Sequence, residues 1–165
     1  WEAGVDADFG RERSGDLDLH LRHPNAGSWF SEPYDCFFRN PDPDWGQLDN
    51  PRDNPFLDLD DFSRTGPENL TLAVPEDTTV IGGEYLIGVD YYENVDRVDG
   101  YEYGAMKAFV RVFINGVLTW DYTDDGDPGF KLMNGRKHFW EVASVSWPDG
   151  VVTKVDRYYE EAPTP

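Results

Sequence analysis

Apolar and polar residues alternate along most of this chain in short runs, and Gly, Pro, Asn and Asp separate the runs. Alternation with a period of two is typical of β-strands, whereas the helical period of 3.6 residues is almost absent. The pattern predicts about nine strands, over residues 16–22, 34–39, 56–60, 69–74, 85–92, 107–114, 117–122, 137–145 and 151–159.

Turn signals join several of these runs into hairpins. Asn115-Gly116 lies between two apolar runs and supplies the two positive-φ positions of a tight turn. The run from Trp147 to Gly150 contains Pro, Asp and Gly and predicts a second turn. Short connections make the strands antiparallel, and packing two sheets together buries one face of each. We therefore expect an all-β fold, an antiparallel β-sandwich of the jelly-roll or immunoglobulin-like type.

Two runs share an unusual arrangement of acids and leucines. One is Asp16-Leu17-Asp18-Leu19-His20-Leu21, and the other is Leu57-Asp58-Leu59-Asp60-Asp61. In a strand, this arrangement places the leucines on one face and the carboxylates on the other. If the two strands are neighbours, their carboxylates form a cluster, although each run taken alone also fits the solvent face of an edge strand.

Clustered carboxylates repel one another unless protons or a cation lie among them, and calcium is the usual cation where oxygen ligands gather. Further oxygens follow the second acidic run, at Ser63, Thr65, Glu68 and Asn69. The spacing is not that of an EF-hand. Zinc prefers His and Cys, and His20 has no evident second nitrogen partner in the sequence.

The charge balance excludes several classes of partner. The chain has 33 acidic and 14 basic residues, and its formal charge is -19 at pH 7. Nucleic acids and anionic membrane surfaces both require clustered Lys and Arg, so we expect neither as a partner. No run of 18 or more apolar residues occurs, so membrane insertion is not expected either.

A chain of 165 residues fits one domain of ordinary size. We expect a single β-sandwich over residues 14–159, with an N-terminal extension or arm at 1–13 and a C-terminal linker or tail at 160–165. The arm either is disordered or donates a strand to the exposed edge of a neighbouring molecule. Cys36 is the only cysteine and is expected to be a buried, inert thiol.

Aromatic side chains make up 15% of the chain, which is more than a small core needs. Trp29, Trp45, Tyr101 and Tyr103 lie in loop-like sequence, where exposed rings could stack on the sugars of a glycan. The other interpretation is that aromatic residues are favoured in strands and bury large areas in the core, to which we assign Trp120 and Trp140.

A catalytic role rests only on the abundance of carboxylates. Two of them at a suitable separation can hydrolyse a glycosidic bond, but nothing singles out one pair among 33 acidic residues. The sequence contains no Gly-x-Ser-x-Gly elbow, phosphate-binding loop or His-Glu-x-x-His motif. The sequence therefore favours a protein that is not an enzyme, and a carboxylate-based hydrolase is the weakest alternative.

Five segments follow one another along the chain: residues 16–25, the acidic run 57–61, the turn Gly66-Pro67-Glu68-Asn69-Leu70, residues 85–92 and the Val-Phe-Ile-Asn-Gly hairpin at 112–116. In this order they resemble the YfaP-like family of uncharacterised bacterial secreted domains. The resemblance covers roughly residues 14–147. It implies an extracytoplasmic β-sandwich, often a module of larger surface proteins, similar in plan to bacterial pre-peptidase C-terminal domains that bind calcium. Related domains often carry paired cysteines, and the lone Cys36 departs from that pattern.

On that resemblance, the expected calcium ligands are Asp18, Asp58, Asp60, Asp61 and Glu68, with Asp16 as a further candidate near the strand end. The expected function is a non-catalytic, calcium-stabilised binding or assembly module of a secreted or cell-surface protein, such as an adhesin domain or filament subunit. Its partners would be copies of itself or other surface proteins. The main alternative is a carbohydrate-binding module that uses the loop aromatics.

Overall fold

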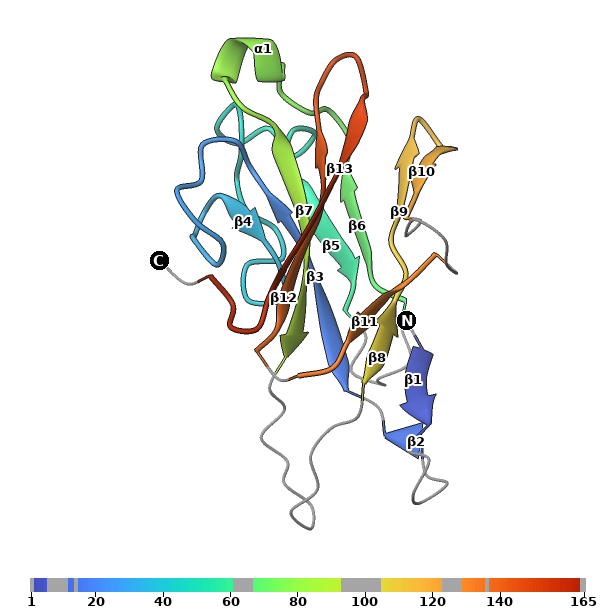
Figure 1. Ribbon diagram of the computed structural model, residues 1–165. Coiled ribbons are helices and arrows are strands. Elements are labelled where there is room, and N and C mark those ends of the chain that lie inside the picture. The colour runs from blue at the N-terminus through green and yellow to red at the C-terminus, as the bar shows by residue number, and fades with distance from the viewer. Residues whose placement is uncertain are drawn as a thin grey trace.

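A five-stranded antiparallel sheet with strand order β13-β12-β7-β3-β4 forms one layer of the protein (Figure 1). Its strands are β3 (Asp16–Arg22), β4 (Asp35–Cys36), β7 (Tyr85–Tyr92), β12 (Phe139–Val145) and β13 (Val152–Tyr159). The structure is a computed structural model that describes residues 2–5, 12–13, 15–60, 67–92, 105–122, 129–135 and 137–163.

Three smaller sheets contain the remaining strands. Two of them are the pairs β5 (Pro55–Leu59) with β6 (Asn69–Leu72), and β9 (Arg111–Ile114) with β10 (Val117–Asp121). The third has the order β11-β8-β1-β2, formed by β11 (Lys131–Met133), β8 (Met106–Ala108), β1 (Glu2–Val5) and β2 (Glu12–Arg13). All these pairings are antiparallel, which confirms the predicted all-β sandwich.

The described residues contain thirteen strands, so the expected number of about nine is too low. Residues 107–114 form two strands, β8 and β9, because the strand is interrupted at Phe109 and Val110. Strands β1, β2 and β11 have two to four residues, too few for alternation to reveal. Because β1 pairs with β8 and β2, part of the expected N-terminal arm pairs within its own chain.

Both predicted hairpins are confirmed. Asn115 and Gly116 have φ angles of 52° and 77° and connect β9 to β10. In the second turn, the Gly150 N–H donates to the carbonyl of Ser146 at 3.1 Å, between β12 and β13. The helix α1 (Thr78–Ile81) is a single turn, and Asp77 caps it by accepting from the N–H of Thr79. Among the described residues, no helix is long and apolar enough to span a membrane.

Both faces of the five-stranded sheet are covered. On the face toward the smaller sheets, Leu17, Val89 and Trp140 pack into a core with Met106 and Met133. The opposite face carries the polar side chains of β3, and there His20 contacts Phe139 of β12 and the rings of Trp29, Phe30 and Phe37, which lie outside the sheet. The carboxylates on this face are therefore partly or fully buried, not solvent-exposed as an edge strand would have them.

Candidate cation site

Three carboxylates from different parts of the chain meet beside β3. Asp18 lies within β3, Asp60 directly follows β5 and Glu68 directly precedes β6. Each offers an oxygen atom, and these oxygens lie within 4.8 Å of one another. The predicted ligands Asp18, Asp60 and Glu68 are thus brought together.

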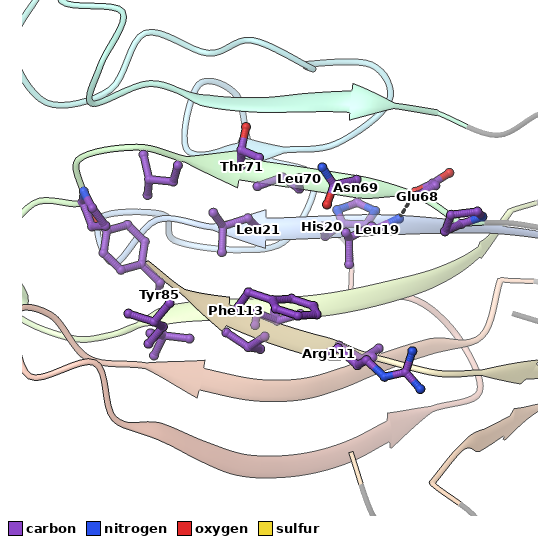
Figure 2. Close-up of a pocket in the computed structure, with 18 of the residues that line it drawn as sticks. Leu19, His20, Leu21, Glu68, Asn69, Leu70, Thr71, Tyr85, Arg111 and Phe113 are labelled. Atoms are coloured by element: carbon purple, nitrogen blue, oxygen red, sulfur yellow. Dashed lines mark hydrogen bonds between the residues drawn. The ribbon is translucent and has the colours of Figure 1, made fainter. Parts of the chain in front are cut away.

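The open edge of β3 positions Glu68. Strand β4 pairs only with Leu21 and Arg22, so the N–H of Leu19 has no strand partner on that side. Oε2 of Glu68 accepts a hydrogen bond from this N–H at 2.6 Å, as the dashed line in Figure 2 shows. The carboxylate of Glu68 therefore binds the edge of the sheet where a neighbouring strand would otherwise lie.

Asp18 is the most strongly perturbed group of the cluster. Its side chain is 3% exposed, and Oδ2 has no hydrogen-bond partner among the described residues. Burial raises the pKa of Asp18 to about 9, and the charges of Glu68, Asp16, Asp90 and Asp60 add to the effect. A carboxylate in this environment requires a proton or a cation to compensate its charge.

A second buried acid, Asp90, stands opposite Asp18 in the pairing of β3 with β7. Burial is the main cause that raises the pKa of Asp90 to about 6, while His20 and Arg39 lower it and Asp35 raises it. Sequence reasoning missed this residue. Asp90 is the single acid in the apolar run of β7, and this could have marked it as a candidate site residue. The strand register that places it against Asp18, however, cannot be read from local sequence.

Asp58, another predicted ligand, lies outside this cluster, so the structure does not bring it together with Asp18, Asp60 and Glu68. It is exposed, and its two oxygens accept from Nδ2 of Asn69 at 2.9 and 2.8 Å. A register shift between Leu57 and Leu59 breaks the alternation of β5, so Asp58 and Asp60 do not share a site. The two acidic strands are not neighbours in one sheet, because β3 and β5 belong to different sheets.

Of the two remaining predicted ligands, the structure describes only Asp16. Asp16 is half-buried at the start of β3, where its charge acts on Asp18, but it is outside the set of mutually close oxygens. Asp61 lies outside the described residues, as do Ser63 and Thr65.

The histidines are held by other contacts. Nδ1 of His20 lies 3.0 Å from Oδ2 of Asp35, and both side chains are fully buried. Nδ1 of His23 accepts from the N–H of Asn25, which leaves Nε2 to donate to Oε2 of Glu76 at 2.8 Å. Both nitrogens of His23 are therefore occupied.

Trp29 and Trp45 are core residues, so the expectation that they are exposed is wrong. They are 1% and 2% exposed. Nε1 of Trp29 donates to Oε1 of Glu141 at 2.8 Å, and Nε1 of Trp45 donates to the carbonyl of Pro33 at 2.7 Å. Because both indoles are enclosed and hydrogen-bonded, neither offers a flat surface to a sugar. Tyr101 and Tyr103 lie outside the described residues.

Other expectations about buried residues are confirmed. Trp140 is fully buried in the core, and Trp120 packs against the same core. Cys36 is fully buried, and burial raises the pKa of its thiol to about 12. A thiol with a raised pKa is unreactive at neutral pH.

Comparison with protein-family models, with curated proteins and with solved structures found no match. The resemblance to the YfaP-like family therefore stays a prediction.

Proposed function

We propose that this protein is a non-catalytic binding or assembly module that a calcium ion stabilises, with Asp18, Asp60 and Glu68 as ligands. The observation that carries the proposal is the buried carboxylate of Asp18, whose Oδ2 has no hydrogen-bond partner among the described residues. Two further carboxylates lie close enough to share one cation with it.

The donor set fits calcium better than zinc. All three side chains supply carboxylate oxygens, the ligands that calcium prefers, and calcium takes about six to eight of them in flexible geometry. Zinc sites favour His and Cys, and among the described residues neither type belongs to this group of close ligand atoms. Backbone carbonyls and water can complete a calcium shell.

The position of the cluster indicates a structural role for the ion. Asp18 belongs to the five-stranded sheet, whereas Asp60 and Glu68 flank the β5-β6 pair of the other layer. An ion bound to all three would connect the two layers at the open edge of β3. Extracellular modules bind calcium at about 10⁻⁴–10⁻³ M, so the secreted or surface location we propose predicts an affinity in this range.

The buried carboxyl group of Asp18 could be neutralised by a proton instead of a cation, because protonation also removes the repulsion between the acids. Thermal melts with and without calcium distinguish the proton from the cation. In EDTA followed by millimolar calcium, the wild-type melting temperature should rise by about 1–5 °C, because calcium would then exceed a Kd of about 10⁻⁴–10⁻³ M by about one- to tenfold. Asp60→Asn and Glu68→Gln should lose this response.

Asp58→Asn is the matched control, because Asp58 lies in the same acidic run but outside the cluster. It should keep the full calcium response. A wild-type melting temperature that does not change with calcium would leave the proton as the explanation and refute the calcium proposal.

A further inference from the structure

A cavity of about 590 Å³ lies between strands β6 and β9, above the five-stranded sheet (Figure 2). Its lining is largely apolar. The sheet contributes Leu19, Leu21, Ile87 and Val89, and the flanking strands contribute Leu70, Leu72, Val112 and Ile114. A space of this size is within the range of ligand-binding pockets.

The two strands beside the cavity each have a free edge. Among the described strands, β6 pairs only with β5, and β9 pairs only with β10. Figure 1 shows the two pairs in the same layer, with β6 and β9 as the inner strands. An extended segment between them would meet backbone hydrogen-bonding groups on one or both sides and an apolar floor below.

We propose that this groove binds an extended strand of a partner protein in which apolar and basic residues alternate. Alternate side chains of a strand point to opposite faces, so one set would enter the apolar cavity and the other would face solvent. The described lining itself contains one acid, Glu68, and one base, Arg111, so the charge that the solvent-facing set would meet is the net charge of -19 of the whole protein. Lys and Arg are therefore the complementary residues.

A second copy of this chain is a poorer occupant. It would carry the same charge of -19, and long-range repulsion opposes the approach of two such molecules. The inference deepens the binding role proposed above by naming the class of ligand, but the groove does not require the cation.

The lengths of β6 and β9 set the length of the segment that the groove can bind. β6 and β9 each contain four residues, which correspond to about 13 Å of extended chain. A bound segment would therefore pair over about four residues, with two of its side chains in the cavity.

The probe is an acetylated octapeptide in which Val and Lys alternate, and the readouts are fluorescence anisotropy and amide hydrogen exchange. We expect a Kd below about 100 μM and exchange slowed about tenfold within both 69–72 and 111–114. Three control peptides should bind at least about tenfold more weakly: the same residues in two blocks, alternating Val and Glu, and the probe with a central Pro.

A variant pair tests the position of the site. Val112→Lys places a charge among the residues that line the cavity and should abolish binding, whereas Leu118→Lys on β10 lies outside the lining and should leave binding unchanged. If Val112→Lys fails to fold, the hydrogen-exchange measurement on wild-type protein still shows whether the peptide binds between the two strands.

Three results would overturn the inference: equal binding of the block peptide, binding without protection in either strand, or peptide-free dimers with both strands protected. The measurements are made in EDTA and in calcium. A normal calcium response without peptide binding would reject only this inference, and peptide binding without a calcium response would reject only the cation site.

Discussion

Asp18 and Asp90 stand directly opposite each other on β3 and β7, and both are buried under the aromatic side of the sheet. Burial raises the pKa of Asp18 to about 9 and that of Asp90 to about 6. Two acids in this arrangement make the metal-free protein sensitive to pH, because the charged forms are disfavoured only in the folded state.

The metal-free protein should lose stability as the pH rises. The pKa of Asp18 is higher in the folded state, about 9, than its ordinary value of 3.8. Between these two values, the folded state retains a proton that the unfolded state has released. The contribution of protonated Asp18 to the free energy of unfolding is therefore complete below about pH 4 and is lost progressively up to about pH 9. For one linked proton, the slope is at most about 1.4 kcal/mol per pH unit.

Asp18→Asn isolates this effect, because Asn resembles the protonated acid and does not titrate. In EDTA, urea unfolding should show the variant close to wild type at pH 4.5 and more stable than wild type at pH 8 by about 1 kcal/mol or more. The variant should also lose the calcium response. If the stability advantage of Asp18→Asn over wild type became smaller as the pH rises, the raised pKa of Asp18 would be contradicted.

Asp156 on β13 connects its own strand to β11, to β12 and to the end of β10 through one carboxylate oxygen. Its Oδ1 accepts from Nζ of Lys131 at 2.8 Å, from Nε1 of Trp140 at 2.9 Å and from the hydroxyl of Tyr122 at 3.2 Å. Its φ angle is 50°, which Asp and Asn tolerate better than most residues. Asp156→Ala should cost about 2–3 kcal/mol in the free energy of unfolding.

Asp156→Asn is the control for that substitution, because the amide oxygen still accepts and Asn still tolerates the backbone angle. Chemical denaturation should show it losing less than half as much stability as the Ala variant. Equal losses in both variants would mean that the negative charge, and not the hydrogen bonds and backbone angle, accounts for the effect.

Gly88 allows the aromatic rings to approach the sheet. A Cβ atom at this position would lie 2.5 Å from the ring of Phe139 and 2.9 Å from that of Trp29. Gly88→Ala should therefore lower the melting temperature, with a cost of about 1–3 kcal/mol. At Gly27, a Cβ would meet no atom within 4 Å, so Gly27→Ala should change stability by less than about 0.5 kcal/mol.

Local sequence patterns were sufficient to predict much of the fold. Alternation defined the bounds of β3 and β7, and Asn115-Gly116 identified the hairpin, because these features depend on residues close in sequence. The same alternation failed at the end of β5, where a register shift after Leu57 leaves Leu59 45% exposed.

The site could be predicted only in part, because its geometry depends on distant pairings. Asp18, Asp60 and Glu68 were predicted from the acidic runs together with the resemblance to the YfaP-like family, but Asp90 meets Asp18 through a register set by strands about 70 residues apart. Trp29 and Trp45 were misread because residues far along the chain, such as Glu141, enclose loop aromatics that seem exposed in the sequence.

Calorimetric titration of the metal-free protein with calcium tests the central claim most directly. At pH 7, wild-type protein should bind one ion and release up to about one proton, which appears as a dependence of the heat on the buffer, because the pKa of Asp18 is near 9. Asp58→Asn should behave in the same way, and Glu68→Gln should bind far more weakly. No measurable binding to wild-type protein at millimolar calcium would contradict the account.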